Sequence, residues 1–439
     1  MSLNNTHRGI LIAVATLGWL LHPVGGPAPF QLEESDLDLN ETALRVDQES
    51  FERWLPWVDP HGQLRDAIST TAQALNVSLA SGLKLRAAWL SRPPATSPDS
   101  SHTLRGLRVL LDPGHHGGEW SEHESRHVER DGHFPIREGN LTYKTAELAA
   151  NLLTHAGATV FLTRGPPPQT PFERHVPTRD LLEKEASIWL GNNAHRADTR
   201  FLMRAYPMWF ADFILRKRRD AKIEDSAAHL FSIGDLRRRS SLATECDAQA
   251  MVSIHYNGAK KPEVNHVMAF VPGHFMKGEL MAPASQKLAL DALMRGRLPI
   301  SAELGQSLVK ALMSEMRLKT IDQAKHGRSY PLPGYRGVFA RNLAVLRRTR
   351  VPVVLVEGPF MSHPAEYPKL LNAEDGSPGI RTHQYARAIL SALKENAPGL
   401  RAYREATGTA GTESPCPLEE WSALSQKDAS ETDTSRGTR

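Results

Sequence analysis

The stretch VLLDPGHHGG (residues 109–118) joins a short apolar run directly to Asp-Pro-Gly, two histidines and two glycines. The apolar run is typical of a buried strand, and the proline and glycine that follow predict a tight turn at its end. In open α/β sheets, binding sites form beyond the carboxyl ends of the strands. The sequence therefore predicts a strand that carries imidazole side chains at one edge of a sheet.

A helix and a second strand follow this first strand along the chain. Residues 140–157 (NLTYKTAELAANLLTHAG) place apolar side chains on one helical face and end in Gly157, which suits a helix C-cap. Residues 159–164 (TVFLTR) again have the apolar, β-branched character of a strand. Strand, helix and strand in this order indicate a β-α-β unit, in which parallel strands are covered by helices.

The same alternation resumes in the second half of the chain. Strands are predicted at residues 251–257, 267–271, 344–347 and 351–358, and helices near 301–317 and 382–394. We therefore expect an α/β fold with a single twisted, largely parallel or mixed sheet and helices on both faces. A small helical region is expected at the N-terminal side, because the apolar residues there recur at three- and four-residue spacing.

The chain divides into regions of different composition. We expect a signal peptide or anchor at residues 1–25, a small helical region and linker at 31–100, the main domain at 105–398 with a long insert at 165–248, and a disordered tail at 404–439.

The N-terminus contains 13 uncharged residues, 9–21, after Arg8. A helix needs about 20 apolar residues to cross a bilayer, so this run is short for a permanent anchor. Its length suits a secretory signal, and we expect export to the periplasm or the medium. An uncleaved anchor and an ordinary helix are the alternatives, and membrane contact is expected only through this segment.

Composition excludes some classes of function. The 439 residues are 40% hydrophobic and 23% charged, as in an ordinary globular protein. The net charge of +4 is too small to indicate a nucleic-acid partner, and no nucleic-acid-binding motif is present. The two cysteines, Cys246 and Cys416, cannot form a zinc–thiolate site and can form at most one disulfide, so they leave the redox compartment open.

Four polar side chains lie where predicted strands end or a helix begins. His115 follows the first strand, His255 and Glu357 lie at the ends of two later strands, and Glu138 opens the first helix. Each has an ordinary alternative as a surface, capping or helix-dipole residue. Together, two histidines and a carboxylate are a recurring zinc site of hydrolases, and a further carboxylate can transfer protons.

The segments VLLDPGHHGG, REGNLTYKTAELAANLL, VFLTR, MVSIHYNG and VPVVLVEGPFMSHPAEYPKL stand in the order seen in zinc-dependent N-acetylmuramoyl-L-alanine amidases of the type 3 family. The resemblance covers residues 107–395 apart from the insert. It implies that Zn²⁺ is held by His115, Glu138 and His255, and that Glu357 is the catalytic acid and base. It also implies hydrolysis of the amide between N-acetylmuramic acid and L-alanine in peptidoglycan or muropeptides.

This sequence departs from the family pattern around the first histidine. His116 follows His115 directly and is an alternative ligand if the turn is shifted. The longer, charged segment that leads to Glu138 contains three further candidate ligands, His123, His127 and His133. A different zinc hydrolase, such as a carboxypeptidase, and a catalytically silent cell-wall-binding protein are the alternative functions.

The insert has no counterpart in the simplest family members. We expect part of 200–235 to form a lid, or a helix that binds a protein activator. Extra helices packed on the sheet, or contact with a membrane surface, are the alternatives. Arg239, in the segment RRRSSLA (237–243), is expected to be structural rather than catalytic.

Overall fold

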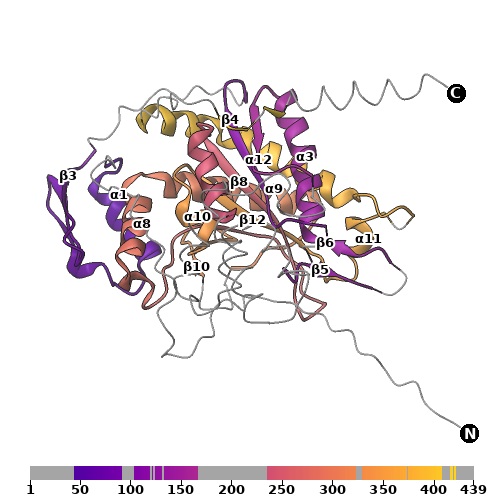
Figure 1. Cartoon of the computed structure of the whole chain (residues 1–439), viewed down its shortest axis with the longest axis horizontal. Coiled ribbons are helices and arrows are strands. Elements are labelled where there is room, and N and C mark those ends of the chain that lie inside the picture. The colour runs from indigo at the N-terminus through magenta and orange to yellow at the C-terminus, as the bar shows by residue number, and fades with distance from the viewer. Residues whose placement is uncertain are drawn as a thin grey trace, which may run out of the picture.

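A computed structural model describes residues 44–90, 103–118, 121, 124–130, 133–166, 235–322, 329–372, 374–407, 416–418 and 420–421. A seven-stranded mixed sheet lies at the centre of the main domain and is covered by helices (Figure 1). The predicted α/β fold is therefore confirmed, but the strand predicted at 344–347 is wrong: these residues form the helix α10 (Ala344–Arg348), whose Val345 and Leu346 pack on the sheet.

The central sheet has the strand order β10-β11-β9-β12-β8-β4-β7. Its strands are β4 (Arg108–Pro113), β7 (Thr159–Leu162), β8 (Ala250–Asn257), β9 (Met268–Pro272), β10 (Tyr330–Pro331), β11 (Val338–Arg341) and β12 (Val353–Phe360). Strands β7, β4, β8 and β12 run parallel, whereas β9 and β11 run in the opposite direction. The carboxyl ends of β4, β8 and β12 therefore lie side by side at one edge.

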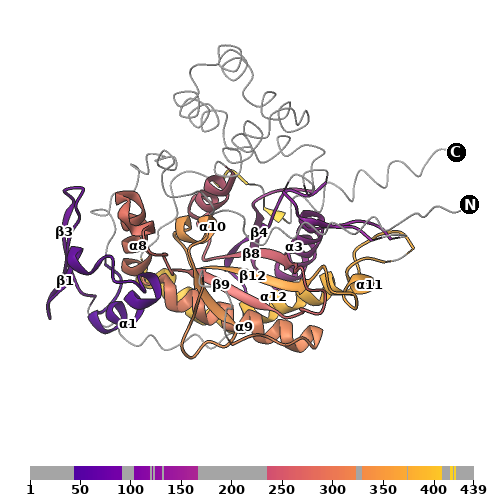
Figure 2. The ribbon, with the colours of Figure 1, turned by 90° about the horizontal axis from the view of Figure 1, so that it is seen from below.

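Both faces of the sheet are buried. Successive side chains of each strand point to opposite faces, so each strand contributes to two apolar layers. On β4, Val109 and Leu111 belong to one apolar layer and Leu110 to the other. The first layer packs under α3 (Glu138–His155), α9 (Arg297–Met316) and α12 (Ile380–Thr407). The second packs under a helical stretch at residues 235–245 and under α10 (Ala344–Arg348), which lies on the side of the sheet opposite α9 (Figure 2).

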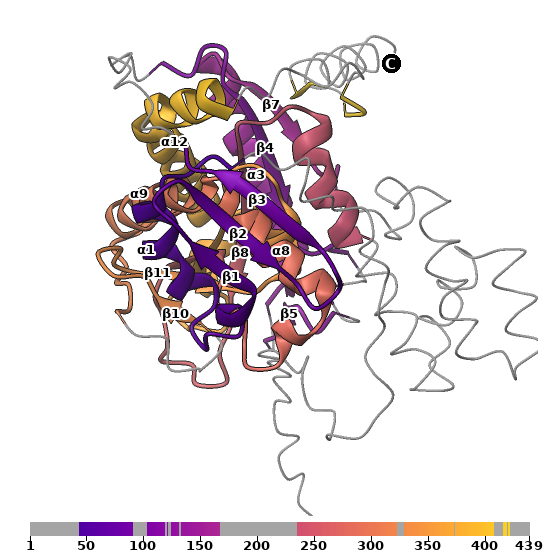
Figure 3. The same cartoon turned by 90° about the vertical axis from the view of Figure 1, so that its left-hand side faces the viewer.

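The N-terminal region is only partly helical. It begins with α1 (Gln48–Val58), whose buried face packs near α8 (Pro283–Met294), and continues through a short 3-10 helix at Arg65–Ala67. Strands β1 (Ile68–Thr70), β2 (Ala74–Ser78) and β3 (Lys84–Ala88) then form a separate antiparallel sheet (Figure 3).

The helical prediction for 31–90 is therefore correct at α1 and wrong at 68–88. In β2, Leu75 and Val77 are buried whereas Ser78 is exposed, so the apolar residues alternate with period two. Gly82, with a φ of 89°, supplies the left-handed turn between β2 and β3. Over short windows, the leucine and alanine residues of this stretch fit both the helical and the strand periodicity. The turn at Gly82 favours the strands.

The C-terminal tail is anchored at several points. Helix α12 extends to Thr407, Cys416 forms a disulfide with Cys246, and Trp421 is buried and donates from Nε1 to Asn151 Oδ1 at 2.7 Å. The prediction of a disordered tail at 404–439 is therefore wrong at these residues. The composition of this region is polar, but one covalent bond and one buried indole hold Cys416 and Trp421 against the domain.

Two of the predicted segments lie outside the described residues. These are the N-terminal 1–25 segment and the 200–234 part of the insert. The described ends of the insert are residues 165–166 and the helical stretch at 235–245. In the described part of the chain, no helix is both long enough and apolar enough to cross a membrane.

The disulfide should contribute measurably to stability, because it joins positions 170 residues apart in the sequence. We expect Cys416→Ser to lower the free energy of unfolding by about 2–4 kcal/mol, since the bond restricts the unfolded chain. Urea unfolding measures this loss. Reductant should reproduce it in the wild type and leave the variant unchanged, and a wild type insensitive to reductant would contradict the pairing.

Candidate metal centre

The Asp-Pro-Gly-His turn after β4 has an unusual backbone. His115 has a φ of 58°, and Gly117 and Gly118 have φ values of 82° and 56°, all in the left-handed region. A Cβ atom on Gly114 would lie 2.4 Å from the His255 imidazole, so only glycine permits this close approach. The turn thus brings the end of β4 against the end of β8.

Three of the four predicted side chains meet at this point. One ligand atom each of His115, Glu138 and His255 lies within 4.8 Å of the others. His115 Nε2 is 3.4 Å from Glu138 Oε2, and His255 Nδ1 is 3.1 Å from Glu138 Oε1. The two imidazole rings lie edge to face, with centroids 4.9 Å apart.

Glu138 is held at the first residue of α3. Its backbone N–H donates to the Arg126 carbonyl at 2.9 Å, and its Oε1 accepts the Tyr256 backbone N–H at 3.1 Å. Burial alone would raise the pKa of Glu138, but the charge of His115 and the hydrogen bond from His255 lower it to about 2. The side chain is therefore a carboxylate at neutral pH, although it is only 2% exposed.

Glu357 lies on β12 directly beside His255 on β8, because the two residues pair in the parallel register. Neighbouring strands are about 4.8 Å apart, and paired residues of parallel strands point to the same face. Burial raises the pKa of Glu357, and attraction to His255 only partly offsets this effect. A carboxyl group with a raised pKa therefore faces the three converging side chains.

The competing histidines lie elsewhere. His116 is buried, with Nε2 3.6 Å from Asp235 Oδ2, and burial lowers its pKa. His127 Nδ1 lies 3.2 Å from the Ser121 carbonyl, and His133 packs against a tyrosine ring away from the three converging side chains. His123 lies outside the described residues.

Glu124 is a site residue that sequence reasoning missed. Its Oε1 lies 3.4 Å from His115 Nδ1, and its Oε2 accepts the His116 backbone N–H at 3.2 Å. Burial would raise the pKa of Glu124, but the charge and hydrogen bond of His115 lower it further than burial raises it. Nothing in the spacing of this charged segment distinguishes Glu124 from its acidic neighbours.

Arg239 donates hydrogen bonds to the turn that contains His115. Its Nη1 donates to Asp112 Oδ1 at 2.9 Å and to the Pro113 carbonyl at 2.7 Å, and its Nη2 donates to the His115 carbonyl at 3.3 Å. Its Nε donates to Asp235 Oδ2 at 2.6 Å. These contacts give Arg239 the structural role expected from the sequence, and they bind the helical stretch 235–245 to the turn.

Arg164, the last residue of VFLTR, joins the same turn to the start of α3. Its Nε donates to the Pro113 carbonyl at 2.9 Å, and its Nη2 donates to the Gly139 carbonyl at 2.7 Å. The guanidinium is fully enclosed, and burial lowers its pKa to about 9. This side chain therefore fixes the position of Glu138 relative to His115.

The donor set fits a metal ion. In the described part of the chain, His115, Glu138 and His255 form a group of metal-ligating side chains close enough to share one ion. Two imidazoles and one carboxylate, with room for water, are the ligands of many catalytic zinc sites. The Tyr256 N–H that donates to Glu138 Oε1, and the Glu124 carboxylate 3.4 Å from His115 Nδ1, are typical of the support around such ligands.

Removing the Arg239 guanidinium should destabilise the protein. We expect Arg239→Met to cost about 3–5 kcal/mol, because it leaves Asp112 and Asp235 buried without their cation. Urea unfolding measures the loss. Arg238→Met is the matched control, since Arg238 pairs with the partly exposed Glu245 on the same helix, and an equal loss in both variants would contradict this account.

The same variant should change the pH dependence of stability. Burial alone would raise the pKa of Asp112, but Arg239 and the Ser253 and Thr163 hydroxyls hold it below the ordinary 3.8. Its contribution is therefore present above pH 3.8 and is lost as the pH falls below that value. In Arg239→Met the pKa of Asp112 should rise, so the loss of stability below pH 3.8 should be smaller than in the wild type, as urea unfolding at a series of pH values measures.

Comparison with known proteins agrees with this geometry. The profile of the N-acetylmuramoyl-L-alanine amidase family matches residues 109–395. YrvJ of Bacillus subtilis (strain 168), whose assignment as an N-acetylmuramoyl-L-alanine amidase is provisional, is 40% identical over 72 residues, which are 16% of this chain and 12% of YrvJ.

Two solved structures are also similar. An N-acetylmuramoyl-L-alanine amidase from Clostridium difficile 630 is 17% identical, with a TM-score of 0.36, over 65% of this chain and 94% of that one. Ami1 from Mycobacterium smegmatis is 16% identical, with a TM-score of 0.38, over 68% and 99%. The family profile covers more than half of the chain, so the resemblance is confirmed and the protein belongs to the N-acetylmuramoyl-L-alanine amidase family.

Proposed function

We propose that this protein is a zinc-dependent N-acetylmuramoyl-L-alanine amidase, which hydrolyses the amide between N-acetylmuramic acid and L-alanine in peptidoglycan. The observation that carries the proposal is the approach of His115, Glu138 and His255 to within 4.8 Å of one another. Glu357, beside His255 in the sheet, supplies the additional carboxyl group that amide hydrolysis needs.

In this proposal, His115, Glu138 and His255 hold the zinc ion. A bound zinc ion supplies Lewis acidity that polarises the amide carbonyl and favours attack by water. The Glu138 carboxylate would bring one negative charge and each imidazole a neutral nitrogen, so a divalent ion and its three ligands would together carry one positive charge. Such a charge stabilises the oxyanion that develops on the attacked carbonyl.

Glu357 moves the proton in the proposed reaction. Its carboxylate accepts a proton from the attacking water, and the acid then gives this proton to the nitrogen of L-alanine as the C–N bond breaks. The products are the lactyl carboxylate of the glycan and a stem peptide with a free amine. The raised pKa of Glu357 suits this role, because a group that both accepts and returns a proton works best near the ambient pH.

We also propose that the protein acts outside the cytoplasm. The Cys246–Cys416 disulfide supports this, since such bonds persist mainly in oxidising compartments. The substrate class of the family lies in the cell wall. Export by the N-terminal segment, and an activator acting on residues 200–235, stay predictions.

Two variants should distinguish the loss of metal binding from the loss of turnover. We expect His255→Ala to lose both zinc and activity, because it removes a proposed ligand. Glu357→Gln should keep zinc but lose about 100-fold or more in turnover, since it removes only the proton carrier. Elemental analysis measures zinc, and mass spectrometry of digested muropeptides should find intact stem peptides with a free L-alanine amine.

Three results would contradict the proposal. Release of terminal amino acids instead of whole stems would indicate a carboxypeptidase. Unchanged zinc content in His255→Ala would place the metal elsewhere, and zinc binding without hydrolysis under any condition would indicate a silent wall-binding protein.

Glu124 should strengthen metal binding through His115. We expect Glu124→Gln to weaken zinc affinity about 10- to 100-fold, because it removes the charge that orients the imidazole. Competition with a chelator measures the affinity directly. Glu129→Gln, at an exposed position of the same segment, is the control, and equal affinities of the two variants would rule out this role.

A further inference from the structure

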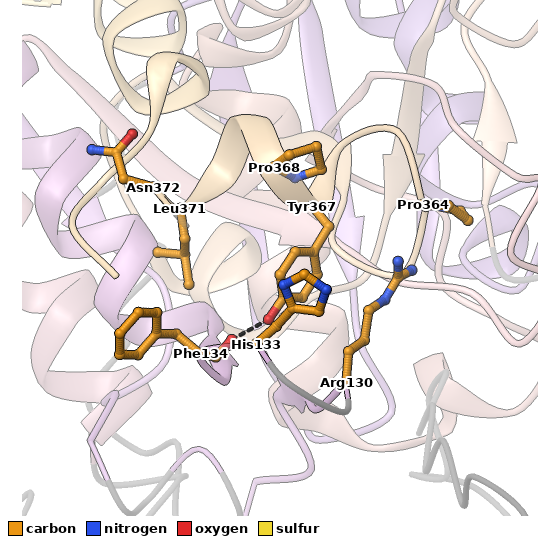
Figure 4. A pocket seen from close by; sticks show the side chains of 8 residues that line it. All are labelled: Arg130, His133, Phe134, Pro364, Tyr367, Pro368, Leu371 and Asn372. Atoms are coloured by element: carbon orange, nitrogen blue, oxygen red, sulfur yellow. Dashed lines mark hydrogen bonds between the residues drawn. The ribbon is translucent and has the colours of Figure 1, made fainter. Parts of the chain in front are cut away.

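A second feature lies near the candidate metal centre, between a β-hairpin and a short helix. The hairpin pairs β5 (His127–Val128) with β6 (Ile136–Arg137), and the helix is α11 (Tyr367–Leu370). A cavity of about 250 Å³ opens between them (Figure 4). The side chains that matter for its chemistry are Arg130, His133, Phe134, Tyr367, Leu371 and Asn372.

The cavity belongs to the same edge of the sheet as the metal centre. Strand β6 leads directly into Glu138, and four residues from Phe134 to Glu138 can span at most about 14 Å. Arg130 Nη2 donates to the Ser362 carbonyl at 2.9 Å, just beyond the end of β12. Ser362 Oγ in turn accepts the Ala259 backbone N–H at 2.9 Å, just beyond the end of β8.

The described lining of the cavity carries positive charge and includes no acidic residue. A guanidinium has five N–H donors, and one N–H of Arg130 is used by the Ser362 carbonyl. Its central carbon lies 5.0 Å from the centre of the Tyr367 ring. In the part of the chain that the structure describes, the cavity lining contains no aspartate or glutamate. The remaining N–H groups of Arg130 can therefore donate to an anionic ligand.

The other walls are apolar and held in place. Phe134 is 45% exposed, which is unusual for so large an apolar side chain, and Leu371 lies on the same side of the cavity (Figure 4). The Tyr367 hydroxyl donates to the Phe134 carbonyl, and the His133 ring packs at 5.0 Å from the Tyr367 ring. Such a fixed site suits a ligand that combines a carboxylate with an aliphatic part.

We propose that this cavity is a subsite for the peptide stem, where Arg130 binds a carboxylate of the residues beyond L-alanine. This inference rests on the proposed function. Three to four extended residues span about 10–14 Å, and the chain from Phe134 to Glu138 limits the separation of these two residues to about 14 Å. The stem residues carry free carboxylates and aliphatic side chains, whereas the neutral sugars of the glycan offer a guanidinium no anionic partner.

The test compares two substrates on the full-length protein. One is a muropeptide with free stem carboxylates, and the other is the same muropeptide with these carboxylates amidated. The wild type should prefer the free acid, and Arg130→Gln should reduce this ratio of kcat/KM about 10- to 100-fold, mainly through KM. Arg130→Lys should recover part of the ratio, because it restores the charge but not the planar geometry.

Lys369→Met is the matched control, since it removes an exposed positive charge from α11 outside the cavity. It should keep the wild-type preference for the free acid. An unchanged ratio in Arg130→Gln, or an equal loss for both substrates, would overturn the subsite.

A binding experiment separates this inference from the proposed function. Titration calorimetry of the free stem peptide against the full-length protein needs no turnover. The peptide should bind the wild type about 10-fold or more tightly than Arg130→Gln, even if no hydrolysis is found. Equal binding by both proteins would overturn the subsite, whereas binding without hydrolysis would overturn only the amidase assignment.

Discussion

Parallel pairing of β4, β8 and β12 is the constraint on which the whole centre depends. It brings three strand ends to one edge, so residues far apart in the chain become neighbours. His255 and Glu357 are adjacent because of strand register alone. The position of His115 also depends on the left-handed turn after Pro113, which directs its imidazole toward His255.

Buried charge fixes that turn. Asp112 accepts hydrogen bonds from Thr163, just after β7, from Ser253 on β8 and from Arg239 on the helical stretch 235–245. Breaking such a network is costly, because a charge in the protein interior has little solvent to stabilise it. This network therefore constrains the position of His115, which is what a site with reproducible geometry requires.

Much of this arrangement could be predicted from the sequence. Apolar runs that end near His115, His255 and Glu357 predict that these residues lie at one edge of the sheet. The helical pattern after Glu138 predicts that Glu138 lies at the start of a helix beside them. Glu124 could not be predicted in this way, because its segment has no periodic pattern and it approaches His115 only in the folded chain. The anchoring of Cys416 also depends on contact between distant segments, because its partner Cys246 lies 170 residues away in the sequence. Local spacing does not record such contacts.

The most direct measurement is the anomalous scattering of crystals grown with zinc, recorded at the zinc absorption edge. The account predicts a peak at about 2.0–2.2 Å from one nitrogen of His115, one nitrogen of His255 and a carboxylate oxygen of Glu138. A peak bound to His116 instead, or no peak on these three side chains at saturating zinc, would contradict it.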